Sequence, residues 1–87
     1  MKCFVYIIRS LKNESFYIGS STDPQKRLEE HNLGHTLFTK NNRPYKLVFT
    51  QEFKDISKAR TVERKIKSWK RRDFIEKIIK DGKIRSA

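Results

Sequence analysis

The stretch FYIGSSTDPQKRLEEHN, residues 16 to 32, joins a strand pattern to a helix pattern. Residues 16 to 20 are mostly apolar or aromatic, which predicts a strand with Gly19 near its end. Asp23 and Pro24 then predict the start of a helix, because Asp caps a helix N-terminus and Pro is tolerated at the first helical position. The stretch therefore predicts a strand, a short turn and a helix, in that order.

The predicted helix ends near Asn32, with Gly34 as its C-terminal breaker. Arg27 and His31 are four residues apart, so they lie on one helical face beside Leu28. A solvated face is the usual role of such a pair. A glycine in the preceding strand leaves a second interpretation open, because a ligand can approach a bare backbone closely.

Three more segments extend this pattern. Residues 3 to 8 are apolar on both faces of a two-residue period, which suits a central strand covered on two sides. Residues 12 and 13 are the expected tip of a hairpin leading to the second strand. Residues 34 to 44 form a polar, basic loop, and residues 45 to 53 alternate apolar and polar, which predicts a third strand.

Two helices are expected after the third strand. The first begins at Ser57, and its apolar stripe recurs at steps of three and four residues. This stripe consists of Ile56, Ala59, Val62, Ile66 and Trp69. A last short helix covers residues 74 to 79 and ends at Gly82. We expect an α+β fold, a small three-stranded, mostly antiparallel sheet flanked by helices, in one domain of residues 1 to 87 with its core at residues 2 to 81.

Charge is the strongest compositional signal. Lys and Arg number 21 and Asp and Glu number 10, for a net charge of +11. Such an excess destabilises a compact chain by self-repulsion and is best explained by a polyanionic partner. Nucleic acid is the expected partner, and an anionic membrane surface is the rival. The candidate nucleic-acid contacts are Gly19, Lys40, Arg43, Arg60, Arg64, Lys67, Lys70 and Arg71.

The longest apolar run, residues 3 to 8, is too short for a signal-peptide core or a membrane-spanning helix. We therefore expect a soluble, cytoplasmic monomer without membrane association. Cys3 is the single cysteine, so it cannot form an internal disulfide or a cysteine-based zinc site. We expect it to be a small buried hydrophobic residue.

Tyr6 and Tyr17 fall in neighbouring strands joined by the predicted hairpin. Their hydroxyls can therefore converge on one patch. Taken alone, however, two such tyrosines are more often core aromatics with a solvated tip.

Glu63 is the one acidic residue between positions 58 and 72, where eight residues are basic. On the helical wheel it lies between Ile56 and Ala59, at the edge of the apolar stripe. A carboxylate turned towards the body of the protein is a candidate ligand for Mg²⁺, which one or two carboxylates commonly hold. The alternative is an ordinary ion pair with Lys67, worth about 0.3 to 0.5 kcal/mol.

Together, these motifs resemble the GIY-YIG nuclease superfamily, in its small single-domain bacterial, UPF0213-like branch. The resemblance rests on VYI at 5 to 7, YIG at 17 to 19, RPYKLVF at 43 to 49, and on Arg27, His31 and Glu63 in that order. It covers most of residues 3 to 80 and implies a GIY-YIG endonuclease-like fold.

The resemblance also implies roles for five residues. Tyr6 matches the tyrosine proposed to take a proton from the attacking water, and Tyr17 the one that orients water or phosphate. Arg27 matches the arginine that braces the scissile phosphate, and His31 a position that assists proton transfer. Glu63 matches the protein ligand of the divalent metal. Hydrolysis of a phosphodiester needs an activated water, a cation and stabilisation of charge on the phosphate oxygens, and this set supplies each.

The chain departs from the family pattern in two places. Phe4 stands where the first motif of the family has glycine, which alters access around Tyr6. Several family nucleases use an asparagine after the metal glutamate, and residues 64 to 87 contain none.

The sequence thus predicts a metal-dependent endonuclease that uses Mg²⁺ or Mn²⁺, with DNA as the expected substrate and a protein partner as a possible source of targeting. The alternatives are a non-catalytic nucleic-acid-binding module on the same scaffold, and a basic adaptor that docks on an acidic protein or ribosomal surface.

Overall fold

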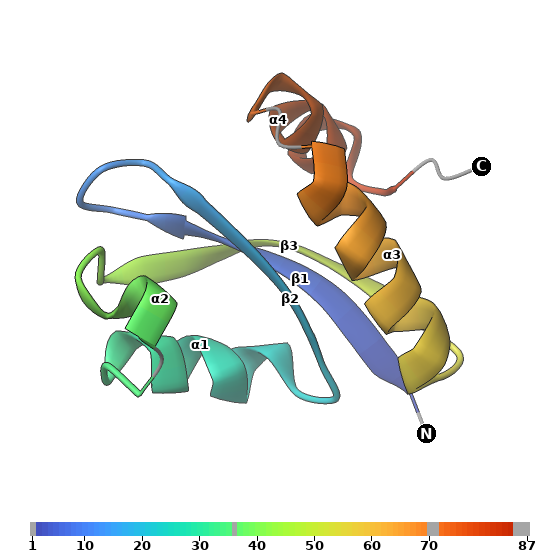
Figure 1. Ribbon diagram of the computed structural model, residues 1–87, viewed down its shortest axis with the longest axis horizontal. Helices are drawn as coiled ribbons and strands as arrows, with labels where there is room; N and C mark the ends of the chain where they lie inside the picture. The colour runs from blue at the N-terminus through green and yellow to red at the C-terminus, as the bar shows by residue number, and fades with distance from the viewer. Residues whose placement is uncertain (1, 36, 70–71, 85–87) are drawn as a thin grey trace.

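A computed structural model describes residues 2 to 35, 37 to 69 and 72 to 84, with the backbone alone described at residues 37, 38 and 69 (Figure 1). One antiparallel sheet has the strand order β2-β1-β3, and helices lie on both of its faces. The elements are β1 (Cys3–Ser10), β2 (Phe16–Ser21), α1 (Pro24–Asn32), α2 (Leu37–Lys40), β3 (Tyr45–Phe53), α3 (Ile56–Trp69) and α4 (Arg72–Asp81).

Side chains of the central strand β1 alternate between two hydrophobic cores, one on each face of the sheet. Val5 and Ile7 point towards α3 and α4, whereas Tyr6 and Ile8 point towards α1. The core beneath α3 and α4 is the larger, and its buried members are Cys3, Val5, Ile7, Ile18, Phe49, Ala59, Val62, Ile66, Ile78 and Ile84. The core beneath α1 is built from Tyr6, Ile8 and Tyr45, with Tyr17, Leu28 and Leu47 at its margin. The molecule is therefore a sheet between two helical layers.

Helix α1 is positioned by its two ends. Asp23 caps the N-terminus, because its carboxylate accepts a hydrogen bond of 3.1 Å from the backbone N–H of Lys26. At the C-terminus, the Asn32 side chain accepts from the N–H of Tyr45 at 2.6 Å and donates to its carbonyl at 3.0 Å. Gly34 follows with a φ of +85°, a conformation that favours glycine. Helix α1 is thus tied to the start of β3.

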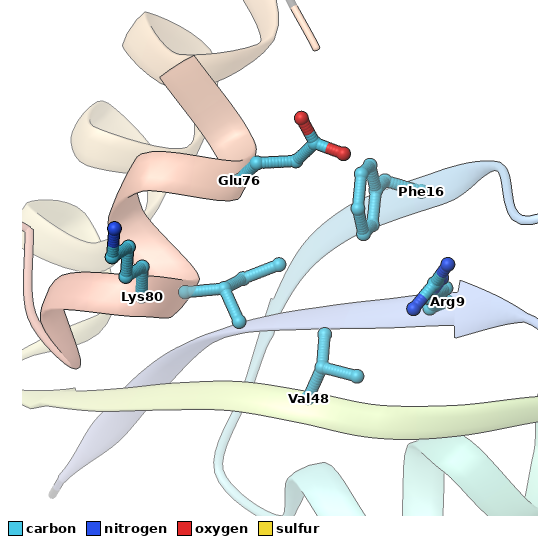
Figure 2. Close-up of a pocket in the computed structure, with 6 residues that line it drawn as sticks. Arg9, Phe16, Val48, Glu76 and Lys80 are labelled. Carbon is cyan, nitrogen blue, oxygen red and sulfur yellow. The ribbon is translucent and has the colours of Figure 1, made fainter. Parts of the chain in front are cut away.

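Helix α4 covers the hairpin end of the sheet on the α3 side. Figure 2 shows a pocket between α4 and the sheet, with Glu76 and Lys80 projecting from the helix and Phe16 and Val48 from the strands. Its volume is about 190 Å³. Arg72 lies over the Phe16 ring, 4.6 Å from its centroid, and fastens the start of α4 to the hairpin.

The structure confirms the predicted α+β class and the three-stranded antiparallel sheet flanked by helices. It corrects the loop predicted for residues 34 to 44, which contains the four-residue helix α2. So short a helix shows no periodic pattern, because it completes little more than one turn. Cys3 is buried and unpaired as expected, and the predicted burial of Trp69 lies outside the described side chains. Among the described residues, no helix has the length and apolar character needed to cross a membrane.

Candidate active site

The five candidate catalytic residues lie on both sides of β2. Strand β2 is at the edge of the sheet, so groups from the α1 layer and the α3 layer can meet across its free side. Tyr6 comes from β1, Tyr17 from β2, Arg27 and His31 from α1, and Glu63 from α3. Contacts and electrostatic interactions link all five.

Tyr6, His31 and Thr39 form a buried chain of hydrogen bonds. The Tyr6 hydroxyl is 3.1 Å from His31 Nε2, and His31 Nδ1 is 2.7 Å from Thr39 Oγ1. His31 and Thr39 have no exposed surface, and Tyr6 is 1% exposed. The solvated-face interpretation is therefore wrong for His31, because helix α1 turns the imidazole into the protein and both ring nitrogens are engaged.

Gly19 makes room for the Tyr6 ring. It stands opposite Tyr6 in the register of β1 and β2 and is itself buried. A Cβ atom at position 19 would lie 2.5 Å from the Tyr6 hydroxyl oxygen and 2.6 Å from Cζ, both closer than atoms can pack. Gly19 thus lets the Tyr6 ring lie across β2. The bare backbone at Gly19, where the sequence leaves room for a ligand to approach, is approached by this ring.

Burial sets the ionisation of the hydrogen-bonded pair. It raises the pKa of the Tyr6 phenol. Arg27 partly offsets this increase, because its positive charge favours the phenolate. Burial also lowers the pKa of the His31 imidazole, and the positive charge of Arg27 adds to that effect. At neutral pH both groups are therefore uncharged, and Nε2 can accept a hydrogen bond from the Tyr6 hydroxyl.

Arg27 lies at the solvent side of this pair. Its Nη1 atom is 2.5 Å from Glu30 Oε1, and 37% of its side chain is exposed. Glu30 is on the next turn of α1, so it orients the guanidinium without removing it from Tyr6. Arg27 is thus both held by the protein and open to an anion from outside.

Glu63 approaches the site from the other helical layer. Its Oε1 atom accepts a hydrogen bond of 2.6 Å from Ser20 Oγ on β2, and its Oε2 atom is 2.7 Å from Lys67 Nζ. Its side chain is 19% exposed, in agreement with its predicted place at the edge of the apolar stripe of α3. Besides burial, which is the largest cause, the negative charge of Glu63 raises the pKa of Tyr6.

Tyr17 connects the two halves of the site. Its ring centroid is 4.8 Å from that of His31, and Lys67 Nζ lies 5.3 Å from the Tyr17 centroid. The Tyr17 ring therefore contacts the imidazole and lies within cation–π distance of the ammonium. This contact brings both predicted tyrosines to one site.

The donor set at Glu63 fits a hard divalent cation. No three side chains among His, Cys, Asp and Glu gather into a metal-binding group anywhere in the described ranges. The Glu63 carboxylate, whose side chain is 19% exposed, is nevertheless suited to Mg²⁺, which keeps several waters and takes few protein ligands. Glu63 would hold the ion, with water and substrate phosphate completing the shell.

Basic residues surround Glu63 on the outer face of α3. Arg60, Arg64 and Lys67 line an open hollow of about 340 Å³ together with Glu63. Lys40 and Arg43 are exposed in the segment that follows α1. The predicted contacts Lys70 and Arg71 lie outside the described residues. The described cations thus border the site on two sides.

Sequence reasoning did not find Ser20 or Thr39. Each contributes a hydroxyl that holds a candidate catalytic side chain, yet Ser20 is 43 residues from Glu63 in the chain. Ser20 follows the YIG motif directly, and that adjacency was the only signal for it. Nothing in the sequence near Thr39 marks it.

Three comparisons with known proteins agree with this arrangement. The family model of the GIY-YIG catalytic domain matches residues 2–78. A UPF0213 protein of Staphylococcus haemolyticus (strain JCSC1435) is 35% identical over 78 residues, which cover 88% of this chain and 94% of that protein. The structure-specific endonuclease subunit SLX1 of Kluyveromyces lactis is 50% identical over 50 residues, which cover 49% of this chain and 17% of that protein.

A solved structure extends the similarity to the fold. The solution NMR structure of a UPF0213 protein from Bacillus halodurans superposes with a TM-score of 0.57 at 30% identity, covering 94% of this chain and 87% of that one. The match to the family model spans residues 2–78, which include both tyrosine motifs and Glu63. The chain therefore belongs to the GIY-YIG nuclease family, among its UPF0213 proteins.

Proposed function

We propose that this protein is a divalent-metal-dependent endonuclease that hydrolyses phosphodiester bonds in nucleic acid, with DNA as its substrate. Its family supports a nuclease-type function. The observation that carries the proposal is the hydrogen bond of 3.1 Å between the Tyr6 hydroxyl and His31 Nε2, with Glu63 acting electrostatically on the same phenol. This arrangement places a proton acceptor behind a tyrosine at the edge of a basic surface.

The buried pair activates the water. In the His31 tautomer that donates from Nδ1 to Thr39 Oγ1, the Nε2 atom accepts a hydrogen bond from the Tyr6 hydroxyl. As the attacking water gives a proton to the Tyr6 oxygen, Tyr6 passes its own proton to Nε2, and Arg27 favours the negative charge on the phenol oxygen during the transfer. Burial disfavours a lasting phenolate and imidazolium, because it raises the pKa of Tyr6 and lowers the pKa of His31, so the two transfers occur together.

The remaining residues bind and stabilise the phosphate. Arg27 has an exposed guanidinium that can pair with the oxygens of the scissile phosphate, where negative charge develops in the transition state. Tyr17 lies between His31 and Lys67, in position to orient the water or the phosphate. When bound at Glu63, Mg²⁺ or Mn²⁺ would supply positive charge to the phosphate and the leaving oxygen.

The test is a panel of labelled single-stranded, duplex, flapped and branched DNA and RNA, incubated with Mg²⁺, Mn²⁺ or EDTA. We expect cleavage with either metal and none in EDTA. Binding should weaken steeply between low and physiological salt, because the basic surface neutralises several phosphates and releases their counterions.

Two outcomes would contradict the proposal. Salt-sensitive binding without cleavage of any substrate would indicate a non-catalytic nucleic-acid-binding module. Failure to bind nucleic acid at any salt concentration would favour a basic adaptor for an acidic protein or ribosomal surface.

A further inference from the structure

Lys67 occupies a position that neither the family motifs nor the proposed mechanism explains. Its ammonium lies 2.7 Å from Glu63 Oε2 and 5.3 Å from the centroid of the Tyr17 ring. An ordinary surface pair at i,i+4 contacts one partner, whereas this ammonium lies between two residues of the candidate site. The distance to the ring is within the range of a cation–π interaction.

The carboxylate that meets Lys67 is itself fixed. Ser20 donates to the other oxygen of Glu63 at 2.6 Å, so the carboxylate cannot rotate freely away from Lys67. Glu63 is 19% exposed and Lys67 is 44% exposed. A cation from solvent can therefore reach this carboxylate, and it meets an ammonium already bound there.

We infer that Lys67 is a built-in competitor for the divalent cation, and that its ammonium must leave Glu63 before a metal ion can bind. This inference rests on the proposed role of Glu63 as metal ligand. A divalent ion bound to Glu63 would lie within a few ångströms of the ammonium, where two positive charges repel strongly. Lys67 thus keeps the carboxylate neutralised without metal and sets a threshold for metal binding.

Metal affinity measures the competition directly. Mn²⁺ binding is followed by electron paramagnetic resonance without nucleic acid, on wild type, Lys67→Met and the control Lys65→Met. Lys65 is exposed on α3 and lies two positions away, so it points to another side of the helix while its loss changes net charge equally. We expect Lys67→Met to bind Mn²⁺ about tenfold more tightly than wild type, and Lys65→Met to change affinity by no more than about twofold.

Glu63→Gln separates this inference from the proposed function. If wild type and Glu63→Gln bind Mn²⁺ equally, Glu63 is not the metal ligand and the proposed function loses its metal site. If Glu63→Gln abolishes binding but Lys67→Met matches Lys65→Met, the site stands and the competition is overturned.

A second measurement uses the unmutated protein, so it does not depend on the folding of a variant. Acetylation of lysines by an amine-reactive ester, read by mass spectrometry, reports how free each ammonium is. Mn²⁺ should accelerate labelling of Lys67 and leave the labelling of Lys65 unchanged. Equal labelling of Lys67 in wild type with and without saturating Mn²⁺ would overturn the inference.

Discussion

The two halves of the candidate site differ in how they are held. On the α1 side, Tyr6, His31 and Thr39 are buried, uncharged at neutral pH and joined by hydrogen bonds. On the α3 side, Glu63 and Lys67 are partly exposed and held by opposite charge. Buried hydrogen bonds fix one geometry, because breaking them leaves unsatisfied polar groups. Exposed ion pairs exchange partners at little cost.

The two halves therefore differ in when they become ready for the reaction. The buried half is ready before substrate arrives, since its proton acceptor is aligned with Tyr6. The charged half is completed only when metal and phosphate replace the internal ion pair. Substitutions in the two halves should therefore impair different properties of the protein, and four variants test this contrast.

The largest effect is expected in the charged half, from Glu63→Gln. The change keeps the shape of the side chain and its hydrogen bond with Ser20 possible, but removes the charge that would hold the metal. Cleavage should fall by about 10³-fold or more, the equivalent of several kcal/mol of lost metal catalysis. Timed cleavage assays in Mn²⁺ measure the rate, a thermal melt measures stability, and a binding titration in EDTA measures affinity for nucleic acid. All three use one preparation of the variant. Near wild-type cleavage would exclude Glu63 as the metal ligand.

Tyr6→Phe tests the buried half. The ring remains to fill its place over Gly19, while the hydroxyl that binds His31 is lost. Cleavage should fall by about 10² to 10⁴-fold, the range for loss of a general base. Stability should fall by about 1 to 3 kcal/mol, because His31 Nε2 is left buried without its partner. The Mn²⁺ affinity of Tyr6→Phe should stay near that of wild type, whereas Glu63→Gln should lose Mn²⁺ binding.

Arg27→Ala tests the link between the two halves. Arg27 is partly exposed to substrate, and its charge also acts on the buried Tyr6 and His31. The cleavage rate should fall by about 10²-fold, as for other donors that act in the transition state, and affinity for nucleic acid much less. The pKa of His31 should rise, because a nearby positive charge that disfavours the imidazolium is removed. An NMR titration of the imidazole measures this shift. Equal losses of rate and affinity, with an unchanged pKa, would reduce Arg27 to one member of a general basic surface.

The smallest effect is expected for Thr39→Val, which replaces the hydroxyl by a methyl group of similar size. His31 Nδ1 then loses a hydrogen bond of 2.7 Å in a fully buried place, so unfolding free energy should fall by about 1 to 3 kcal/mol. Cleavage should fall by about tenfold or less, because the imidazole is less well oriented behind Tyr6. Thr39→Ser keeps the hydroxyl and should restore the rate. A Ser variant as slow as the Val variant would show that Thr39 acts only through packing.

Much of the fold follows from local sequence patterns. The three strands, the Asp23 cap and the breaker Gly34 are all set by residues close together in the chain, and the structure confirms them. Of the predicted α3 stripe, Ala59, Val62 and Ile66 are buried, whereas Ile56 at the start of the helix is 39% exposed. The small helix α2 was not predicted, because four residues carry no period and its place depends on packing against α1. The predicted central position of residues 3 to 8 is confirmed, because β1 pairs with both β2 and β3.

The site divides in the same way. The sequence by itself determined the tyrosine motifs, the pair on α1 and the isolated glutamate, because residue type and spacing along the chain carry that information. Only the tertiary structure decided that His31 is buried against Tyr6 and Thr39, that Gly19 yields space to Tyr6, and that Lys67 and Ser20 share Glu63. Except for the pair of Lys67 and Glu63 within α3, these contacts join different elements. They arise when the sheet and helices pack, and local pattern does not encode which side chains then meet across the edge of β2.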